Sequence, residues 1–450
     1  MRKVNTIAFI LTAAAGALAQ QQSWVARYAN PTGGWNVPAA VKISASGITA
    51  VVGTTRNKAG TSDIATVLYD RKGNQLWADV YNGPGGGEDY GVDAAFDHLG
   101  NLYVAGSSDG GTGTDMDYVV IKYSPSGART WIARYNGPAN SSELVKALAV
   151  DSGGNAIVTG RSSTGANSQD WDIATIKLNP FGARQWTARY GHAALQADEA
   201  TDVAVDAAGN AYVVGTADTG VNSDIVTIKY SPLGAQQWLH LYGNEIAGAD
   251  IPAKMVVDSA GSVYVCGSTW SNEVATLRFL AYKLTPGGTL DWAYQRASIS
   301  RATASALALD KDGNLLVGGQ VGDTAKTDLF IAKLNSSGVE QWAQTYDGGD
   351  LRDDETVDIA CDSSGNTYLA GRSRGSTTAW DYALLSFSGT GDRLWTRRYN
   401  GPSSSSMDEA VAMALGPKGM IVLTGSSPNA TRNTDFATVA FTALVRSGPP

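Results

Sequence analysis

One sequence pattern recurs along nearly the whole chain, and it restricts the possible folds more than any other feature. Its landmarks are a tryptophan, a glycine after an apolar run and an aspartate that opens the next run, and successive copies of each lie 50 to 55 residues apart. The tryptophans are Trp24, Trp77, Trp131, Trp186, Trp238, Trp292, Trp342 and Trp395. Repeats of this length are typical of solenoids, propellers and arrays. The 450 residues are therefore expected to form eight copies of one unit.

Each unit contains four short stretches with the composition of β-strands. In the unit that ends at Tyr242, these stretches are residues 203–205, 212–214, 225–230 and 238–242. Aromatic and β-branched residues recur in them with a period of two, which indicates strands. An Asp-x-x-Gly-Asn sequence, as at Asp206 to Asn210, separates the first two stretches and has the residues of a tight hairpin turn. Four antiparallel strands per unit predict an all-β fold whose units are the blades of a β-propeller.

The two ends of the repeat array are incomplete in complementary ways. Trp24 to Tyr28 has the pattern of a fourth strand with no other three before it, whereas the last unit, from Asp408 to about Leu444, has three strands and no closing tryptophan. The N-terminal strand can therefore complete the C-terminal blade. Pairing of this kind closes the ring and leaves no open sheet edge. We predict a single closed propeller of eight four-stranded blades.

A combination of residues within each unit is specific enough to compare with known repeats. In one unit it reads Gly209-Asn-Ala-Tyr-Val-Val-Gly215, followed by Asp224, Lys229-Tyr230, Gly234 and Trp238. This combination resembles the SBBP β-propeller repeat of bacterial secreted and surface proteins, and the resemblance covers the chain from Trp24 to about Leu444. It implies a propeller and export, and it implies no defined reaction. The family name suggests seven blades, so a seven-bladed ring is the alternative to the eight units counted here.

The first 19 residues have the organisation of a secretory signal peptide. Arg2 and Lys3 precede an apolar run, and Ala17-x-Ala19 forms a cleavage site that would leave Gln20 as the first residue of the propeller, which we expect over residues 20–450. The apolar run is shorter than the roughly 20 residues of a spanning helix. We therefore expect an exported monomer, secreted or periplasmic, without a membrane span.

The composition excludes nucleic-acid binding, and the residue pattern supports no catalytic function. The chain has 34 basic and 42 acidic side chains, so it lacks the basic surface that nucleic-acid binding requires. Its histidines, His98, His192 and His240, share no spacing typical of a metal site or a catalytic triad. Cys266 and Cys361 stand where other units have small residues, mostly apolar, as is typical of buried cysteines. We predict no catalytic residue, and whether the chain is an enzyme stays open.

Acidic residues at the start of the innermost strand are one candidate site. They occur in six of the eight units, at Asp89, Glu143, Asp198, Asp250, Asp354 and Asp408. Because the innermost strands surround the axis, these carboxylates are expected to form a ring at one mouth of the central channel. Such a ring would attract a cation such as Ca²⁺, which prefers several oxygen ligands. The alternative is that they are turn acids that face water, and no cofactor other than Ca²⁺ is expected.

Four tryptophans outside the repeat are the other candidate site. They are Trp35, Trp171, Trp270 and Trp380. Trp35 lies in the first loop between blades, and the others lie in loops between second and third strands that are rich in Ser, Thr, Asn and Gly. These surroundings suit stacking on a sugar or contact with a protein partner. The alternative is that each tryptophan packs back on the edge of its blade.

These features favour a secreted, non-enzymatic binding module. Both loop sets lie on the same face of a propeller, and we expect this face to bind a glycan or an envelope or extracellular protein. One alternative is a propeller enzyme, either glycoside-active, since Ser124 to Trp131 partly resembles a sialidase turn, or quinone-dependent, since Gly182-Ala-Arg-Gln-Trp186 resembles the repeat of such dehydrogenases. The other alternative is a scaffold of the cell envelope.

Overall fold

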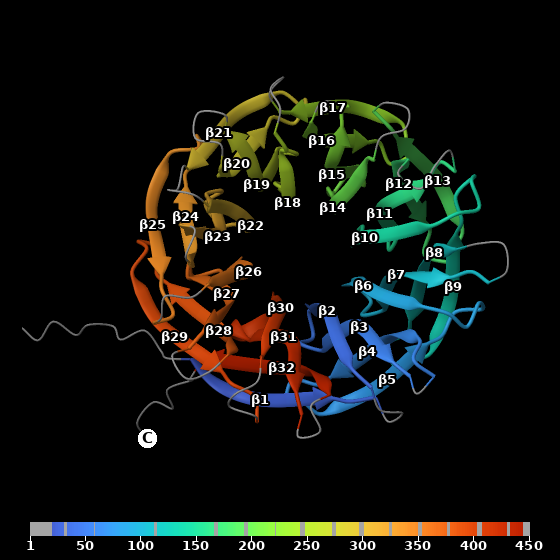
Figure 1. Ribbon diagram of the computed structural model, residues 1–450, viewed down its shortest axis with the longest axis horizontal. Helices are drawn as coiled ribbons and strands as arrows, with labels where there is room; N and C mark the ends of the chain where they lie inside the picture. The colour runs from blue at the N-terminus through green and yellow to red at the C-terminus, as the bar shows by residue number, and fades with distance from the viewer. Residues whose placement is uncertain are drawn as a thin grey trace, which may run out of the picture.

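A computed structural model describes residues 20–443 apart from 31–33, 58, 112–114, 166–169, 193–196, 221, 244–247, 272–275, 297–300, 324–325, 350–352, 376–378, 403–406 and 430–432. Eight four-stranded sheets surround a central axis as the blades of a propeller (Figure 1). The predicted all-β fold of eight blades is confirmed, and the seven-bladed alternative is not. The signal peptide predicted for residues 1–19 lies outside the described residues. Within the described part, no helix has the length and apolar character needed to cross a membrane.

The strands of a blade follow one another in the chain, and the first lies nearest the axis (Figure 1). Blades 1 to 4 are β2 (Asn36–Ile43), β3 (Thr49–Arg56), β4 (Ser62–Tyr69) and β5 (Gln75–Tyr81); β6 (Asp89–Phe96), β7 (Leu102–Asp109), β8 (Met116–Tyr123) and β9 (Arg129–Tyr135); β10 (Glu143–Val150), β11 (Ala156–Ser163), β12 (Trp171–Leu178) and β13 (Arg184–Tyr190); β14 (Glu199–Val205), β15 (Ala211–Asp218), β16 (Ser223–Tyr230) and β17 (Gln236–Tyr242). Blades 5 to 7 are β18 (Ile251–Val257), β19 (Val263–Ser271), β20 (Thr276–Leu284) and β21 (Leu290–Arg296); β22 (Arg301–Leu309), β23 (Leu315–Gly322), β24 (Thr327–Leu334) and β25 (Glu340–Tyr346); β26 (Asp354–Cys361), β27 (Thr367–Arg374), β28 (Trp380–Phe387) and β29 (Arg393–Tyr399). Blade 8 is β30 (Glu409–Leu415), the 3-10 helix η1 (Pro417–Gly419), β31 (Ile421–Pro428), β32 (Thr434–Ala443) and β1 (Gln20–Tyr28).

The propeller has two distinct faces. Tight turns between first and second strands and between third and fourth strands lie on one face, here named the turn face. In the turn of blade 3, the carboxylate of Asp151 accepts the backbone N–H groups of Gly153 and Asn155, both at 2.9 Å. Loops between second and third strands and between blades lie on the opposite face, here named the loop face.

Strand β1 closes the ring. It pairs antiparallel with β32, with Trp24 opposite Ala440 and Tyr28 opposite Phe436. Figure 1 shows β1 along the outer side of blade 8, far in sequence from the strands it completes. The predicted pairing of the N-terminal strand with the last blade is therefore confirmed. Because every blade is packed between two others, no blade lies at an open end of the array.

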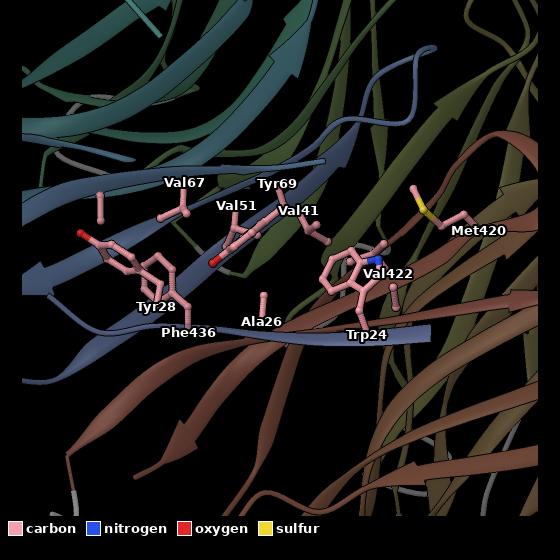
Figure 2. Close-up of a cluster of buried hydrophobic side chains, with 12 residues drawn as sticks. Trp24, Ala26, Tyr28, Val41, Val51, Val67, Tyr69, Met420, Val422 and Phe436 are labelled. Atoms are coloured by element: carbon pink, nitrogen blue, oxygen red, sulfur yellow. The ribbon is translucent and has the colours of Figure 1, made fainter. Parts of the chain in front are cut away.

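The hydrophobic core lies between neighbouring blades. Figure 2 shows the cluster between blades 8 and 1, where Trp24 and Tyr28 of β1 meet Val51 and Tyr69 of blade 1. Phe436 of β32 belongs to the same cluster and is completely buried. Comparable clusters fill the other junctions, so the packing of side chains between blades holds the ring together.

Seven of the eight repeat tryptophans, all of which the structure describes, cover a glycine in the third-to-fourth turn of the next blade. A Cβ atom on Gly182 would come within 2.8 Å of Trp131, and the φ of Gly182 is +83°, a conformation that favours glycine. The seven pairs are Trp24–Gly73, Trp77–Gly127, Trp131–Gly182, Trp186–Gly234, Trp238–Gly288, Trp292–Gly338 and Trp342–Gly391. Trp395 differs because its neighbour is blade 8, whose third and fourth strands are not consecutive in the chain and are joined by no turn.

Candidate functional site

The six acids predicted at the channel mouth are buried at the loop-face ends of the innermost strands. Each is at most 1% exposed. The carboxylates of Asp89, Asp198, Asp354 and Asp408 accept backbone hydrogen bonds from the loops that precede them, as when Gly83 N–H donates to Asp89 at 2.6 Å and Gly401 N–H donates to Asp408 at 2.7 Å. Burial raises the pKa of all six acids, for Glu143 to about 7. These carboxylates therefore anchor the loops between blades, and their binding of a metal stays a prediction.

In four blades the acid begins a polar row that crosses all four strands. In blade 2, Ser108 lies opposite both Asp89 and Asp117, and Arg134 donates to Ser108 Oγ at 2.7 Å and to Asp117 Oδ2 at 3.0 Å. The equivalent rows are Glu143–Ser162–Asp172–Arg189, Asp354–Ser373–Asp381–Arg398 and Asp408–Ser427–Asp435–Arg27. Charge-assisted hydrogen bonds of this kind are strong. The rows are therefore part of the framework of the blades.

Blade 6 has no arginine in this position, and three carboxylates gather where it meets blade 7. Thr345 replaces the arginine. Carboxylate oxygens of Asp328, Asp347 and Asp354 lie within 4.8 Å of one another, and the Lys326 ammonium lies 2.7 Å from Asp347 and 3.4 Å from Asp328. Of the six predicted acids, only Asp354 belongs to this cluster. Oxygen ligands suit Ca²⁺, but Lys326 already neutralises part of the charge of this cluster, and Ca²⁺ binding was predicted for the ring of six acids and not for these three residues.

The structure does not bring the four predicted tryptophans together. They belong to blades 1, 3, 5 and 7, two blades apart from one another. Three of them lie against arginine. The guanidinium of Arg161 is 4.4 Å from the ring centre of Trp171, that of Arg374 is 4.7 Å from Trp380, and that of Arg56 is 5.8 Å from Trp35. Trp380 is also buried. Part of their surface is therefore used in packing, and binding of a glycan by them stays a prediction.

The central channel carries charged residues that the sequence does not reveal. A β-bulge in the first strand of every blade shifts the register by one residue, and bulges re-aim side chains. A cavity of about 220 Å³ on the axis is lined by residues that include Lys42, Asp93, Asp202, Lys254 and Asp358. None of the six predicted acids, all of which are described, contributes to its wall.

These channel charges compensate one another. Lys42 lies 3.0 Å from Asp93. Asp202 accepts the backbone N–H of Met255 in the next blade at 2.9 Å, and burial raises the pKa of Asp202 and of Asp358. The attraction of Asp202, followed by that of other channel carboxylates, raises the pKa of Lys254. The channel therefore holds lysines and aspartates whose charges offset one another, and the contacts of Asp93 and Asp202 join neighbouring blades.

A larger cavity of about 650 Å³ lies on the turn face between blades 7 and 8, at the only place where no turn covers the repeat tryptophan in the described structure. We name it the seam cavity. Its walls are residues 361–364, 366, 368, 386, 394, 395 and 415–419. Tyr368 and Trp395 form its aromatic side, with ring centres 6.0 Å apart. The hydroxyl of Tyr368 donates to Asp362 at 2.8 Å, and burial raises the pKa of the Cys361 thiol to about 11.

Two features of blade 8 distinguish this junction from most of the others. No described turn covers Trp395, whereas in six of the other blades the indole N–H donates to a carbonyl of the next turn, as Trp342 does to Gly389 O at 3.1 Å. The first turn of blade 8 also lacks the repeated aspartate and asparagine, which are replaced by Gly416 and Met420. Volumes of a few hundred Å³ with aromatic walls and a few polar groups are typical of ligand sites.

The fold and these rows define the protein as an eight-bladed β-propeller. A model of the SBBP β-propeller repeat matches residues 185–220 and 237–273. The resemblance stated from the sequence is confirmed, and the matched residues are SBBP β-propeller repeats.

Individual proteins are more distantly similar. The regulatory protein FlaEY of Caulobacter vibrioides is 26% identical over 220 residues, which cover 41% of this chain and 22% of that protein. The chain thus spans about a fifth of the length of this curated relative. The structure of Sqt1 from Chaetomium thermophilum has 11% identity and a TM-score of 0.56, over 95% of this chain and 100% of that chain. The β-propeller domain of a trilobed protease from Pyrococcus furiosus has 10% identity and a TM-score of 0.43, over 92% and 97%. At 11% identity the Sqt1 structure supports the fold alone.

Sequence reasoning missed both cavities, although part of the signal was present. In the sequence, Cys361 has the pattern of a small buried residue and Trp395 is one more landmark of the repeat. The incomplete last unit indicated where a turn would be absent. That Trp395 would face this gap follows only from the order of the blades in space.

Proposed function

We propose that the protein is a non-enzymatic binding module and that the seam cavity is its ligand site. The observation that carries this proposal is the open aromatic side formed by Tyr368 and Trp395 beside the carboxylate of Asp362. Aromatic faces and a few polar groups recognise small ligands and the side chains of partners. The loop face with its four tryptophans, predicted from the sequence, remains the alternative surface, and an enzyme or an envelope scaffold remain the alternative functions.

The test is a binding screen of the full chain against glycans and short peptides, repeated with two tryptophan variants. Trp395→Ala removes the wall of the seam cavity, whereas Trp342→Ala removes an equivalent tryptophan that a turn covers. We expect ligands of the wild type to be lost in Trp395→Ala and retained in Trp342→Ala, provided that both variants give native circular dichroism. Ligands that bind equally well to Trp395→Ala would contradict the proposal. Catalytic turnover of any ligand would also contradict it.

We also propose that the protein acts outside the cytoplasm. The basic and apolar segments of residues 1–19 and the Ala17-x-Ala19 site support this. Expression followed by separation of medium, periplasm and cytoplasm, with mass spectrometry of the N-terminus, tests it. We expect the exported protein to begin at Gln20. Recovery of the uncleaved chain from the cytoplasm alone would refute export.

A further inference from the structure

An aspartate and a lysine occur together in the turn-face half of most blades. The aspartate opens the first turn and the lysine lies on the third strand, as in Asp97/Lys122, Asp151/Lys177, Asp206/Lys229, Asp258/Lys283 and Asp310/Lys333 of blades 2 to 6. Lys177 lies 3.1 Å from Asp151, and Lys333 lies 2.9 Å from Asp310. Blades 1 and 8 have neither charge in these positions, with Ser44 and Leu68 in one and Gly416 and Ala440 in the other. In seven blades, therefore, both charges are present or both are absent.

Blade 7 is the exception, because it keeps the aspartate without the lysine. Ser386 lies opposite Tyr368 in the sheet, as Lys122 lies opposite Tyr103 in blade 2. The ammonium of Lys122 is 4.7 Å from the ring centre of Tyr103. Comparable contacts are made by Lys229 with Tyr212 and by Lys283 with Tyr264. Blade 7 thus retains the carboxylate and the aromatic ring that receive an ammonium group in other blades.

The position of the missing ammonium opens into the seam cavity. In blade 2 the Lys122 ammonium also donates to Pro180 O in the turn of the next blade at 3.2 Å, so protein encloses it. At the seam, Ser386 replaces the lysine and no described turn covers the place, and Asp362, Tyr368, Ser386 and Trp395 all line the cavity. A cation from outside blade 7 can therefore reach the position that the lysine ammonium occupies in blades 2 to 6.

Two other cations lie near this place, and neither pairs with Asp362 in the described structure. Lys418 lies in the wall contributed by blade 8. The guanidinium of Arg397 lies 5.7 Å from the ring centre of Trp395, donates to Thr396 O at 2.9 Å and is not part of the cavity wall. The Asp362 carboxylate accepts the backbone N–H groups of Ser364 and Asn366, as in the other turns, and lacks only the ammonium.

We propose that the seam cavity binds an alkylammonium or guanidinium group, placed between the carboxylate of Asp362 and the ring of Tyr368, with its carbon chain along Trp395. This inference rests on the proposed function and gives the chemical class of its ligand. A cation over an aromatic face and beside a carboxylate is held by two attractions that act together. The side chain of lysine or arginine, or a small primary amine, has this chemistry.

The test uses three probes that differ in charge at similar size. Nα-acetyl-lysine methylamide and Nα-acetyl-arginine methylamide carry the cation, and Nα-acetyl-norleucine methylamide does not. Calorimetric or NMR titration of the full chain is expected to show at least fivefold tighter binding of the charged probes, with weaker binding as salt is raised. Equal binding of the norleucine probe would overturn the proposal.

Ser386→Lys is the decisive variant, because it restores the lysine that blades 2 to 6 possess. We expect it to weaken binding of the charged probes at least tenfold and to raise the melting temperature, since its ammonium takes the place of the ligand. Asp362→Asn should weaken binding at least fivefold, whereas the control Asp206→Asn in blade 4 should not. Lys418→Gln should leave binding equal or tighter. Undiminished binding in Ser386→Lys would overturn the proposal.

The source of the cation can be inside or outside the chain, and the same titration separates the two. Arg446 stands three residues beyond the last residue of β32 in the sequence. Probe binding by the wild type indicates an external ligand, and binding only by Arg446→Gln indicates that this arginine competes for the site. Absence of binding in both would overturn the cation assignment. If Trp395-dependent ligands then prove to be uncharged, the proposed function stands while this inference fails.

Discussion

The guanidinium of Arg27 lies 3.1 Å from the carboxylate of Asp435, and this ion pair joins residues that are 408 positions apart. Within blade 2, Arg134 and Asp117 make the same ion pair at 3.0 Å across only 17 positions. The closing blade therefore uses the bonds of an ordinary blade. The two ion pairs differ in the conformational entropy lost when they form, because the pair in blade 8 requires the two ends of the array to come together.

Loss of Arg27 should weaken the closed ring. Arg27→Leu leaves Asp435 nearly buried without its cation, and removal of one partner from such a pair costs about 2 to 4 kcal/mol. We expect a loss of this size in the free energy of unfolding, measured by denaturant titration. Arg134→Leu is the matched control, and it should cost a similar amount while leaving β1 as protected from hydrogen exchange as in the wild type. Exchange in β1 that is unchanged by Arg27→Leu would argue against this role.

Glu143 should make stability fall as pH rises. Burial raises its pKa to about 7 from 4.5, so the folded protein binds a proton that the unfolded chain has lost between these values. Stability is therefore lost as pH rises through this window, by up to about 1.4 kcal/mol per pH unit. Glu143→Gln should flatten this slope, and the variant should gain most relative to the wild type above pH 7. Denaturant titrations from pH 4.5 to 8 measure it, and an unchanged slope would contradict the assignment.

Lys254 should be needed in the channel chiefly at neutral and higher pH. Lys254→Met leaves the carboxylates of Asp202 and Asp358 without their main cation, and burial already raises the pKa of both. Because solvent reaches the channel, we expect a cost of only about 1 kcal/mol at pH 8. The cost should shrink toward pH 4 as the carboxylates take up protons. Lys311→Met, at an exposed turn, is the control and should show no such trend in thermal unfolding.

Trp342 should contribute more to stability than Trp395. Trp342 covers Gly391 and donates to Gly389 O, whereas no turn of the described residues covers Trp395. Replacement of a well-packed tryptophan by alanine costs about 3 to 5 kcal/mol, and we expect Trp395→Ala to cost about 1 kcal/mol less than Trp342→Ala because it breaks no such hydrogen bond. Unfolding of both variants in urea measures the difference. Equal costs would indicate that Trp395 is enclosed after all.

Local patterns were sufficient to predict the blades. The patterns that predict a blade all come from residues that are neighbours in the same hairpins. They are the alternation in residues 212–214 and 225–230, the turn from Asp206 to Asn210, and the tryptophan at 238. The solitary strand at Trp24 to Tyr28 also predicted the closure, since a fourth strand without three others must pair elsewhere. The acid at Asp89, by contrast, was expected at the channel mouth and lies buried, because its carboxylate binds the backbone of its own loop at Gly83.

The sequence by itself determined the repeat, the four-stranded unit, their number and the closing strand, because these depend on contacts within about 55 residues or on simple complementarity of the two ends. The tertiary structure alone decided which side chains meet across blades. The bulges that place Lys254 and Asp202 in the channel are irregularities of backbone register that leave no periodic signal. The sequence shows that Ser386 replaces the repeated lysine. The functional consequence of this replacement depends on Trp395, which lines the same cavity. That cavity forms only when blade 7 packs against blade 8, the blade formed by the two ends of the array.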